Sequence, residues 1–358
     1  GTGATVRRSG AEGVAAPVVV EVDGTRAPWV PQEPNAELTL PEGTKQVVVD
    51  PDAHLNDAGR SNNRLPAKWN VIATGWFDDL SATAGTFSLS ADLVFRPADD
   101  NRNLYLIGLE HGAQDIVSTY LGYVRYLGNP VTRSTREHRL LFTAGPALLD
   151  PAFRPTDDGA VALGGNIGYT WDTRPFAKVQ IHGHRVSVAT GGGVVPGSDE
   201  RWASAGATYV QLLPAHPRHV FATRLRAAWA SGDVEHRLLT LGGSDSLRSI
   251  PSPVWVGNQR LTGQLEYRAA VLRDVSLPIG FGWLSEVVVV PGVEAGVVWR
   301  DGEPRPAAAT GVTAGVYLLF DALGARPTLF GVSAGMPLAV TTIPMNEAQV
   351  YVSFDYAF

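Results

Sequence analysis

From about residue 68 onward, the chain is a succession of segments of about 10 to 14 residues in which apolar and polar side chains alternate. In 219–230, Phe221 and Leu225 fall on one face, and Arg224 and Arg226 fall on the other. The same alternation occurs at 260–270 and 349–358. Because successive side chains of a strand point to opposite faces of its sheet, each segment predicts a β-strand with one apolar and one polar face.

The number of segments and the joints between them indicate how the strands are arranged. About fourteen segments follow one another, and their joints are of two sizes. Short joints include 96–100, 173–175 and 213–217, and long joints include 145–159, 190–201, 231–259 and 300–308. Short turns at one end and long loops at the other are typical of outer-membrane barrels, whose closure leaves no unpaired edge in lipid. The sequence therefore predicts an all-β fold, a transmembrane antiparallel β-barrel of about 14 strands (roughly 12 to 16) over residues 67–358.

The composition agrees with a protein that faces lipid without membrane helices. Charged residues make up 18% of the chain, which is below the roughly 25% of an ordinary soluble domain. No run of about 18 consecutive apolar residues occurs, and this excludes an ordinary membrane-spanning helix. Outer-membrane lipid is therefore an expected partner. The formal net charge of −6 argues against a nucleic-acid partner.

A soluble β-sandwich is the alternative fold, because the strands of a sandwich also alternate. In a sandwich the apolar faces would form an interior and the charged faces would meet bulk water. The number of segments and the two sizes of joint favour the barrel.

Residues 1–66 differ in character from the rest of the chain. Short β-branched runs at 18–22 and 44–49 are separated by prolines, and a polar, turn-rich stretch follows at 50–63. These features predict a small periplasmic β-module or an extended lead that ends in a linker. The first residues do not resemble a signal peptide, so we expect that one has been removed or that the chain is part of a longer precursor. The chain contains no cysteine, which rules out disulfides and is compatible with the periplasm.

The long joint at 231–259 contains the most informative motif, Leu241-Gly242-Gly243-Ser244-Asp245-Ser246-Leu247-Arg248-Ser249-Ile250. It resembles the Leu-Gly-Gly-x-x-Ser-(Val/Leu)-Arg-Gly-(Tyr/Phe) signature of the outer-membrane assembly and secretion barrels. This superfamily, also called the bacterial surface antigens, includes the BAM-type insertase and the two-partner secretion transporters. The matching residues are Leu241, Gly242, Gly243, Ser246, Leu247 and Arg248, whereas Ser249 and Ile250 depart from the pattern. The resemblance implies a loop that folds back into the barrel, and the count of about fourteen segments places this loop between the ninth and tenth strands.

An arginine inside a barrel needs a partner, because a guanidinium is always charged and is costly to leave unpaired. The superfamily places the partner in a Phe-x-Asp-x-Gly pattern on the second strand after the loop, where this chain has Gly292-Val293-Glu294-Ala295-Gly296. The resemblance therefore implies that Glu294 pairs with Arg248. Taken without the resemblance, Arg248 is more simply a solvated loop residue.

Three further stretches resemble superfamily motifs in the expected order. A Tyr-x-Asp-Thr-Arg-Asp strand end is matched by Asp172, Thr173 and Arg174. A Glu-x-Arg strand directly after the loop is matched by Glu266 and Arg268. The last strand alternates and ends in aromatic residues, a pattern by which outer-membrane barrels are recognised for assembly: Phe354, Tyr356 and Phe358.

Motifs of catalysis and metal binding are absent from the sequence. It contains no His-Glu-x-x-His, no Gly-x-Ser-x-Gly and no phosphate-binding loop. His182 and His184 share one face of a predicted strand, but no third ligand accompanies them, so we expect them to line the barrel. We therefore expect no enzymatic activity, no cofactor and no metal site.

Two functions from different classes are compatible with the sequence. The resemblance implies translocation or membrane insertion of a polypeptide, with a seam between 68–80 and 349–358 that opens. The alternative is a structural anchor that tethers a periplasmic partner or a cleaved N-terminal partner and transports nothing. The short stretch before the barrel, without the transport-associated repeats of the superfamily, strengthens the anchor hypothesis. A passive pore is disfavoured, because an inward loop would obstruct it.

Overall fold

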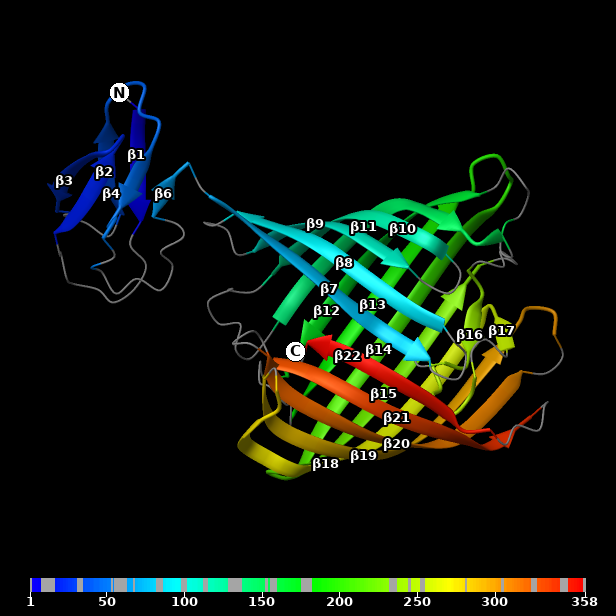
Figure 1. The fold of residues 1–358 in the computed structure, drawn as a ribbon. Helices are drawn as coiled ribbons and strands as arrows, with labels where there is room; N and C mark the ends of the chain where they lie inside the picture. Colours follow the sequence, from blue (N-terminus) through cyan, green and yellow to red (C-terminus); the bar gives the residue numbers. More distant parts are fainter. Residues whose placement is uncertain are drawn as a thin grey trace. The chain divides into compact units, whose positions relative to one another are not determined.

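Figure 1 shows the fold in a computed structural model of residues 1–358. The structure describes residues 2–7, 17–30, 35–52, 54, 63–66, 68–81, 86–97, 102–111, 115–127, 137–151, 154, 160–174, 182–231, 237–243, 246–251, 255–280, 282–303, 306–322, 327–341 and 347–356. Two compact units are present, the first made of residues 1–72 and 95–104 and the second of residues 73–94 and 105–358. In the described parts of the chain there is no helix long and apolar enough to cross a membrane.

Fourteen antiparallel strands form the barrel, which confirms the predicted fold class. In chain order they are β7 (Trp69–Ser81), β8 (Thr86–Pro97), β9 (Asn103–His111), β10 (Asp115–Tyr126), β11 (Glu137–Leu149), β12 (Val161–Asp172), β13 (Gly183–Val194), β14 (Arg201–His216), β15 (His219–Ala230), β18 (Gln259–Pro278), β19 (Gly282–Trp299), β20 (Ala307–Ala322), β21 (Pro327–Val340) and β22 (Gln349–Tyr356). Each strand neighbours the next along the chain, and β22 returns to β7 to close the ring. The two longest strands are β18 and β19.

The joints differ in length, but not strictly by the end of the barrel as the sequence predicts: β12 ends at Asp172 and β13 begins at Gly183, so the joint predicted at 173–175 is longer than expected. The motif-bearing joint lies between β15 and β18, which are the ninth and tenth strands of the barrel. Two predicted loops are partly strand, because β11 continues to Leu149 and β13 continues to Val194. The glycines of both stretches let the neighbouring backbones approach closely enough to extend the ladder: an added Cβ at Gly145 would lie 1.9 Å from the Thr119 carbonyl oxygen.

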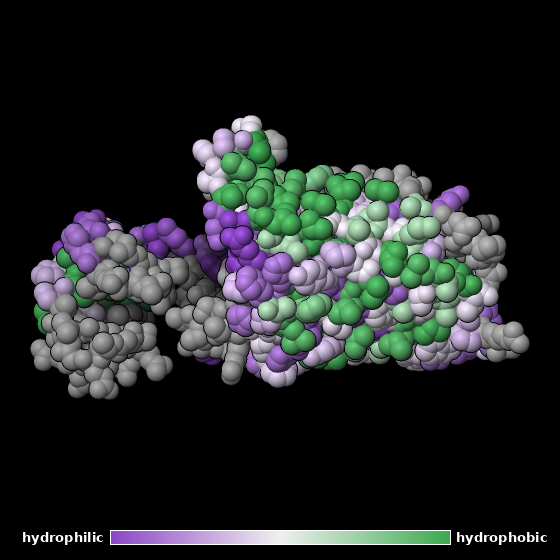
Figure 2. Space-filling model, turned by 90° about the horizontal axis from the view of Figure 1, so that it is seen from below, coloured by the Kyte–Doolittle hydropathy of each residue, from purple (hydrophilic) through white to green (hydrophobic). Residues whose placement is uncertain are grey.

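The alternation in sequence corresponds to two different environments in the barrel. On β15, Phe221 and Leu225 are 43% and 47% exposed, whereas Val220 and Ala222 are 3% and 4% exposed. The outward residues are therefore apolar, and the arginines of the same strand share the inward face with the buried residues. Figure 2 shows apolar residues over much of the visible outer face of the second unit. We call the space bounded by the inward faces the lumen.

The closing seam between β22 and β7 is shorter than the described ladders that join β10 through β22 around the barrel. Tyr351, Val352 and Phe354 pair with Ser81, Leu80 and Phe77, with a register shift before the last pair. By contrast, β19 and β20 pair along almost their whole length. Because each paired residue contributes backbone hydrogen bonds, the β22–β7 seam is held by fewer bonds than the β19–β20 ladder.

The first unit consists of two small sheets. One is the pair β1 (Thr2–Arg7) and β4 (Asn35–Leu40), and the other has the order β3-β2-β5-β6. The strands of the second sheet are β2 (Val18–Val22), β3 (Thr25–Trp29), β5 (Val47–Val49) and β6 (Arg64–Leu65). Residues of both sheets form one core, which contains Val20 of β2, Leu40 of β4 and Val47 of β5. Asp23 adopts a positive φ of 48°, and its carboxylate accepts hydrogen bonds from the backbone N–H groups of Lys45 and Gln46.

Candidate functional site

The motif lies in a hairpin that packs against the inward face of the barrel. Its two short strands, β16 (Leu239–Leu241) and β17 (Trp255–Gly257), pair antiparallel. Figure 1 shows β16 and β17 at the end of the barrel opposite the carboxyl end of β22. We call residues 239–257 the inward loop. Side chains of the loop cluster with Val298 of β19 and Ala309 of β20, which lie on the inward faces of their strands.

Two glycines and a serine shape the start of the inward loop. Gly242 and Gly243 have φ values of 126° and 88°, which side chains with a Cβ rarely adopt. Ser246 Oγ accepts a hydrogen bond from the Gly242 N–H at 2.7 Å and donates one to the Gly242 carbonyl oxygen at 3.0 Å. The Gly243 N–H donates to the Ile250 carbonyl oxygen at 2.8 Å. These residues therefore form a closed turn, and this accounts for the Gly-Gly-x-x-Ser spacing.

Three apolar side chains anchor the inward loop. Leu241, Leu247 and Ile250 are each 0% exposed and pack with Val298 and Ala309. Ile250 stands where the superfamily has an aromatic residue, and its side chain is fully enclosed. Burying three such side chains contributes about 1.5 to 3 kcal/mol each. The loop is therefore a packed part of the barrel interior.

Glycines on three neighbouring strands make room for the loop. An added Cβ at Gly335 of β21 would lie 2.6 Å from the carbonyl oxygen of Arg248, and one at Gly311 of β20 would lie 2.0 Å from Ser249 Oγ. At Gly296 of β19 it would lie 2.8 Å from a methyl group of Leu241. Gly296 is the last residue of the stretch matched to Phe-x-Asp-x-Gly, whereas sequence reasoning did not single out Gly311 and Gly335. Their signal is a glycine at an inward position on each of the three neighbouring strands β19, β20 and β21.

Glu294 holds the backbone of the inward loop. This carboxylate is 5% exposed, and Ser249, at 0% exposure, donates to its Oε1 from both the backbone N–H and the hydroxyl group, each at 2.6 Å. Gln264 Nε2 donates to the other carboxylate oxygen at 3.4 Å and to the Ser246 carbonyl oxygen at 2.9 Å. Ser249, which stands where the motif that this stretch resembles has glycine, therefore provides a hydroxyl donor to Glu294.

Arg248 forms its ion pair with Glu266, so the predicted pairing of Arg248 with Glu294 is wrong. Arg248 Nη1 donates to Glu266 Oε1 at 3.4 Å and to the Tyr317 hydroxyl oxygen at 3.3 Å. Glu266 also accepts a hydrogen bond from Arg268 at 2.8 Å. Glu294 faces the next loop residue, Ser249, because the backbone turns there. The long Arg248 side chain extends beyond Ser249 to Glu266. On β18, Glu266 is the next inward residue after Gln264, which is the register partner of Glu294.

The remaining motif residues predicted from the sequence lie away from the inward loop or outside the described residues. Arg174 donates to Asp172 through Nε at 2.9 Å and Nη2 at 2.6 Å. Thr173 Oγ1 donates to the His184 carbonyl oxygen at 3.1 Å, so this motif ties β12 to β13 where β12 ends. Phe354 and Tyr356 belong to β22, and Phe358 lies outside the described residues.

The two histidines considered as metal ligands are not brought together with further ligands. His184 contacts the Trp171 ring edge-on, with the ring centroids 4.7 Å apart, and His182 is exposed. Within the described ranges, no group of three or more histidine, aspartate or glutamate side chains is placed to hold a metal ion.

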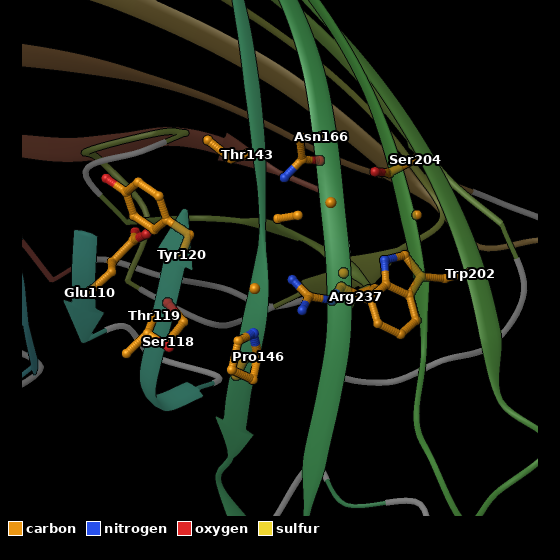
Figure 3. A pocket seen from close by; sticks show the side chains of 16 residues that line it. Glu110, Ser118, Thr119, Tyr120, Thr143, Pro146, Asn166, Trp202, Ser204 and Arg237 are labelled. Carbon is orange, nitrogen blue, oxygen red and sulfur yellow. The ribbon is translucent and has the colours of Figure 1, made fainter. Parts of the chain in front are cut away.

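A cavity of about 390 Å³ is lined by residues of β9 to β14 and by Arg237, which precedes β16 in the joint that carries the inward loop. Figure 3 shows Tyr120, Asn166 and Ser204 around it, with Arg237 beside Trp202. The Arg237 guanidinium lies 4.8 Å from the Trp202 ring centroid, a cation–π contact. Polar side chains and glycines make up most of the lining of the cavity.

A double-mutant cycle separates the two candidate partners of Arg248. Arg248→Ala should lower the free energy of unfolding by about 1 kcal/mol, because the contact is long and Glu266 retains Arg268. The coupling energy of Arg248→Ala with Glu266→Gln should exceed its coupling with Glu294→Gln, as measured from urea unfolding of the detergent-solubilised barrel. A larger coupling with Glu294 would restore the pairing implied by the sequence.

The barrel resembles solved outer-membrane structures at low sequence identity. CdiB from Escherichia coli matches with a TM-score of 0.54 and 14% identity over 94% of this chain and 62% of that chain. BamA from Haemophilus ducreyi lacking POTRA domains 1-3 matches with a TM-score of 0.48 and 12% identity, over 81% of this chain and 70% of that chain. The chain thus spans less than two thirds of the length of the CdiB structure. No protein-family model matches the chain, and no curated protein matches it in sequence.

Proposed function

Since this chain has the fold of the CdiB barrel, we propose that it is a bacterial outer-membrane barrel that acts in translocation or membrane insertion of a polypeptide. The observation that carries this proposal is the inward loop, held in the lumen by Glu294 and by packing against Gly296, Gly311 and Gly335. A loop fixed in this way restricts free diffusion through the barrel. It is a feature suited to controlled passage rather than to a passive pore.

The cavity lined by β9 to β14 and Arg237 supports the same function. It provides space along these strands that the inward loop does not fill. Polar side chains line it, and they can offer hydrogen bonds to an extended peptide without demanding one sequence. An extended segment could therefore pass or rest beside the inward loop.

The seam between β22 and β7 supports lateral opening toward the membrane. Its described ladder is short and contains a register shift, so separating β22 from β7 breaks fewer backbone hydrogen bonds than separating β22 from β21. The inward loop also touches this region, because the Tyr351 hydroxyl donates to the Ile250 carbonyl oxygen at 3.4 Å. Movement of β22 would therefore disturb the hydrogen bond between Tyr351 and the inward loop.

Locking the seam tests this function. The chain contains no cysteine, so an introduced pair forms the only disulfide. Leu80→Cys with Val352→Cys joins register partners across the β7–β22 seam, and Val332→Cys with Val352→Cys joins partners across β21–β22 as the matched control. In a strain that lacks the native protein, we expect the seam lock to block restoration of the missing surface and secreted proteins until a reductant is added.

The outcomes of this experiment separate transport from anchoring. If deletion of the protein leaves the surface and secreted proteins unchanged but releases one periplasmic protein from the membrane fraction, the barrel is an anchor and the transport proposal fails. If the β21–β22 lock blocks function as strongly as the β7–β22 lock, general rigidity matters and the seam does not open. Mass spectrometry of the membrane and medium fractions measures both.

A further inference from the structure

Four arginines meet on the inward face of the barrel beside the inward loop: Arg224 and Arg226 of β15, Arg268 of β18 and Arg248 of the loop. Arg224 is repelled by the other three and is attracted by Glu266. Among the residues that the structure describes, the carboxylates beside these arginines are Glu266 and Glu294, so the described arginines outnumber the described carboxylates at this place.

Both carboxylates are already engaged. Glu266 accepts hydrogen bonds from Arg268 and Arg248. Glu294 accepts from Ser249 and Gln264. Among the residues that the structure describes, no hydrogen bond or ion pair is formed by the Arg224 guanidinium, which has five N–H donors. Its N–H donors are therefore not used by a hydrogen bond or an ion pair within the described chain, although Glu266 attracts its charge.

An arginine in this position is unfavourable for the barrel alone. A guanidinium remains protonated in proteins, and like charges that share a partly enclosed space repel each other more strongly than in bulk water. The planar fork of Arg224 is suited to binding a carboxylate or phosphate through two parallel hydrogen bonds. A ligand with a carboxylate or a phosphate would compensate the positive charge of the arginines that Glu266 and Glu294 do not balance.

We propose that Arg224, with Arg226 and Arg268 beside it, forms a binding site in the lumen for the carboxylates of an acidic polypeptide segment. The choice of a peptide as the source of the carboxylates rests on the proposed function. A polypeptide that passes through the lumen would bring its acidic side chains to these arginines. Direct binding can be measured without transport, so this site can fail while the transport proposal stands, and the reverse also holds.

The test measures heat stability of the detergent-solubilised barrel with a hexaglutamate peptide at constant ionic strength. Saturating peptide should raise the unfolding midpoint of the parent by about 3 °C. Arg224→Gln should weaken peptide binding at least about tenfold and should leave the midpoint of the empty barrel unchanged or higher, because it relieves repulsion. Arg139→Gln, which removes an arginine on the inward face of β11, is the matched control and should retain the peptide-induced shift.

Three outcomes would overturn this inference. One is an unchanged peptide-induced shift in Arg224→Gln. Another is a lower midpoint of the empty Arg224→Gln barrel, which would mean that Arg224 already has a stabilising partner. The third is an equal shift with inorganic phosphate at the same ionic strength, which would assign the site to small anions. If Arg224→Gln does not fold, Arg224→Lys retains the charge without the fork and should bind the peptide more weakly than the parent.

Discussion

Replacing Glu294 with alanine should lower the free energy of unfolding of the barrel by about 3 kcal/mol. The Ser249 N–H and hydroxyl group, both within a residue that is fully buried, lose their acceptor. Water cannot replace it readily at that position, so each donor is left buried and unsatisfied. The same change removes one of the two acceptors of Gln264, which keeps its hydrogen bond to the Ser246 carbonyl oxygen. The predicted loss is larger than for Arg248→Ala, whose partner Glu266 keeps a second arginine.

Unheated gel electrophoresis across a urea series measures this loss, because a folded barrel migrates differently from an unfolded one. Glu303→Ala is the matched control, since Glu303 is exposed in the turn after β19, and it should leave the midpoint unchanged. Glu294→Gln retains one acceptor oxygen and should recover part of the stability. Equal midpoints for Glu294→Ala and the parent would show that the inward loop is not held by this carboxylate.

Replacing Gly335 with alanine should displace the inward loop from the barrel wall. The added Cβ would lie 2.6 Å from both the carbonyl carbon and the carbonyl oxygen of Arg248, and backbone atoms in a packed turn cannot move aside cheaply. The loop must shift as a unit, which separates Ser249 from Glu294. We expect a loss of about 2 kcal/mol and a barrel that conducts ions more readily than the parent.

Planar-bilayer conductance and the same urea series measure these two effects. Gly206→Ala is the matched control, because an added Cβ there meets only the Ala227 carbonyl oxygen at an ordinary 3.7 Å. It should change neither conductance nor stability. If Gly335→Ala lowers stability without raising conductance, the inward loop is not what restricts flow through the lumen.

Much of the barrel could be predicted from the sequence, because period-two alternation is a local property. On β15, the outward position of Phe221 and the inward position of Arg224 follow from counting along the chain. The number of strands and the placement of the motif between the ninth and tenth of them follow from the same alternation and from the joints. The partners across the lumen do not, because they depend on the register of several strands at once.

The two carboxylates near the loop illustrate this limit. Glu266 and Glu294 are both inward residues that the sequence singled out, and they lie close together on β18 and β19, since Glu294 pairs with Gln264 and Gly292 pairs with Glu266. Which of them meets Arg248 depends on where the loop backbone turns and how far the side chain extends. The loop receives its position from Gly296, Gly311 and Gly335, on strands that are distant from it in sequence.

The sequence by itself determined the strands, their two faces and the presence of a Gly-Gly-x-x-Ser turn followed by an arginine. These are local consequences of side-chain alternation and of backbone conformations that glycine tolerates. Only the tertiary structure decided that Arg248 pairs with Glu266, that Glu294 binds Ser249 and that Arg224 is left with a surplus charge. Those assignments depend on distances between side chains of different strands, and closing the ring of strands sets all of these distances together.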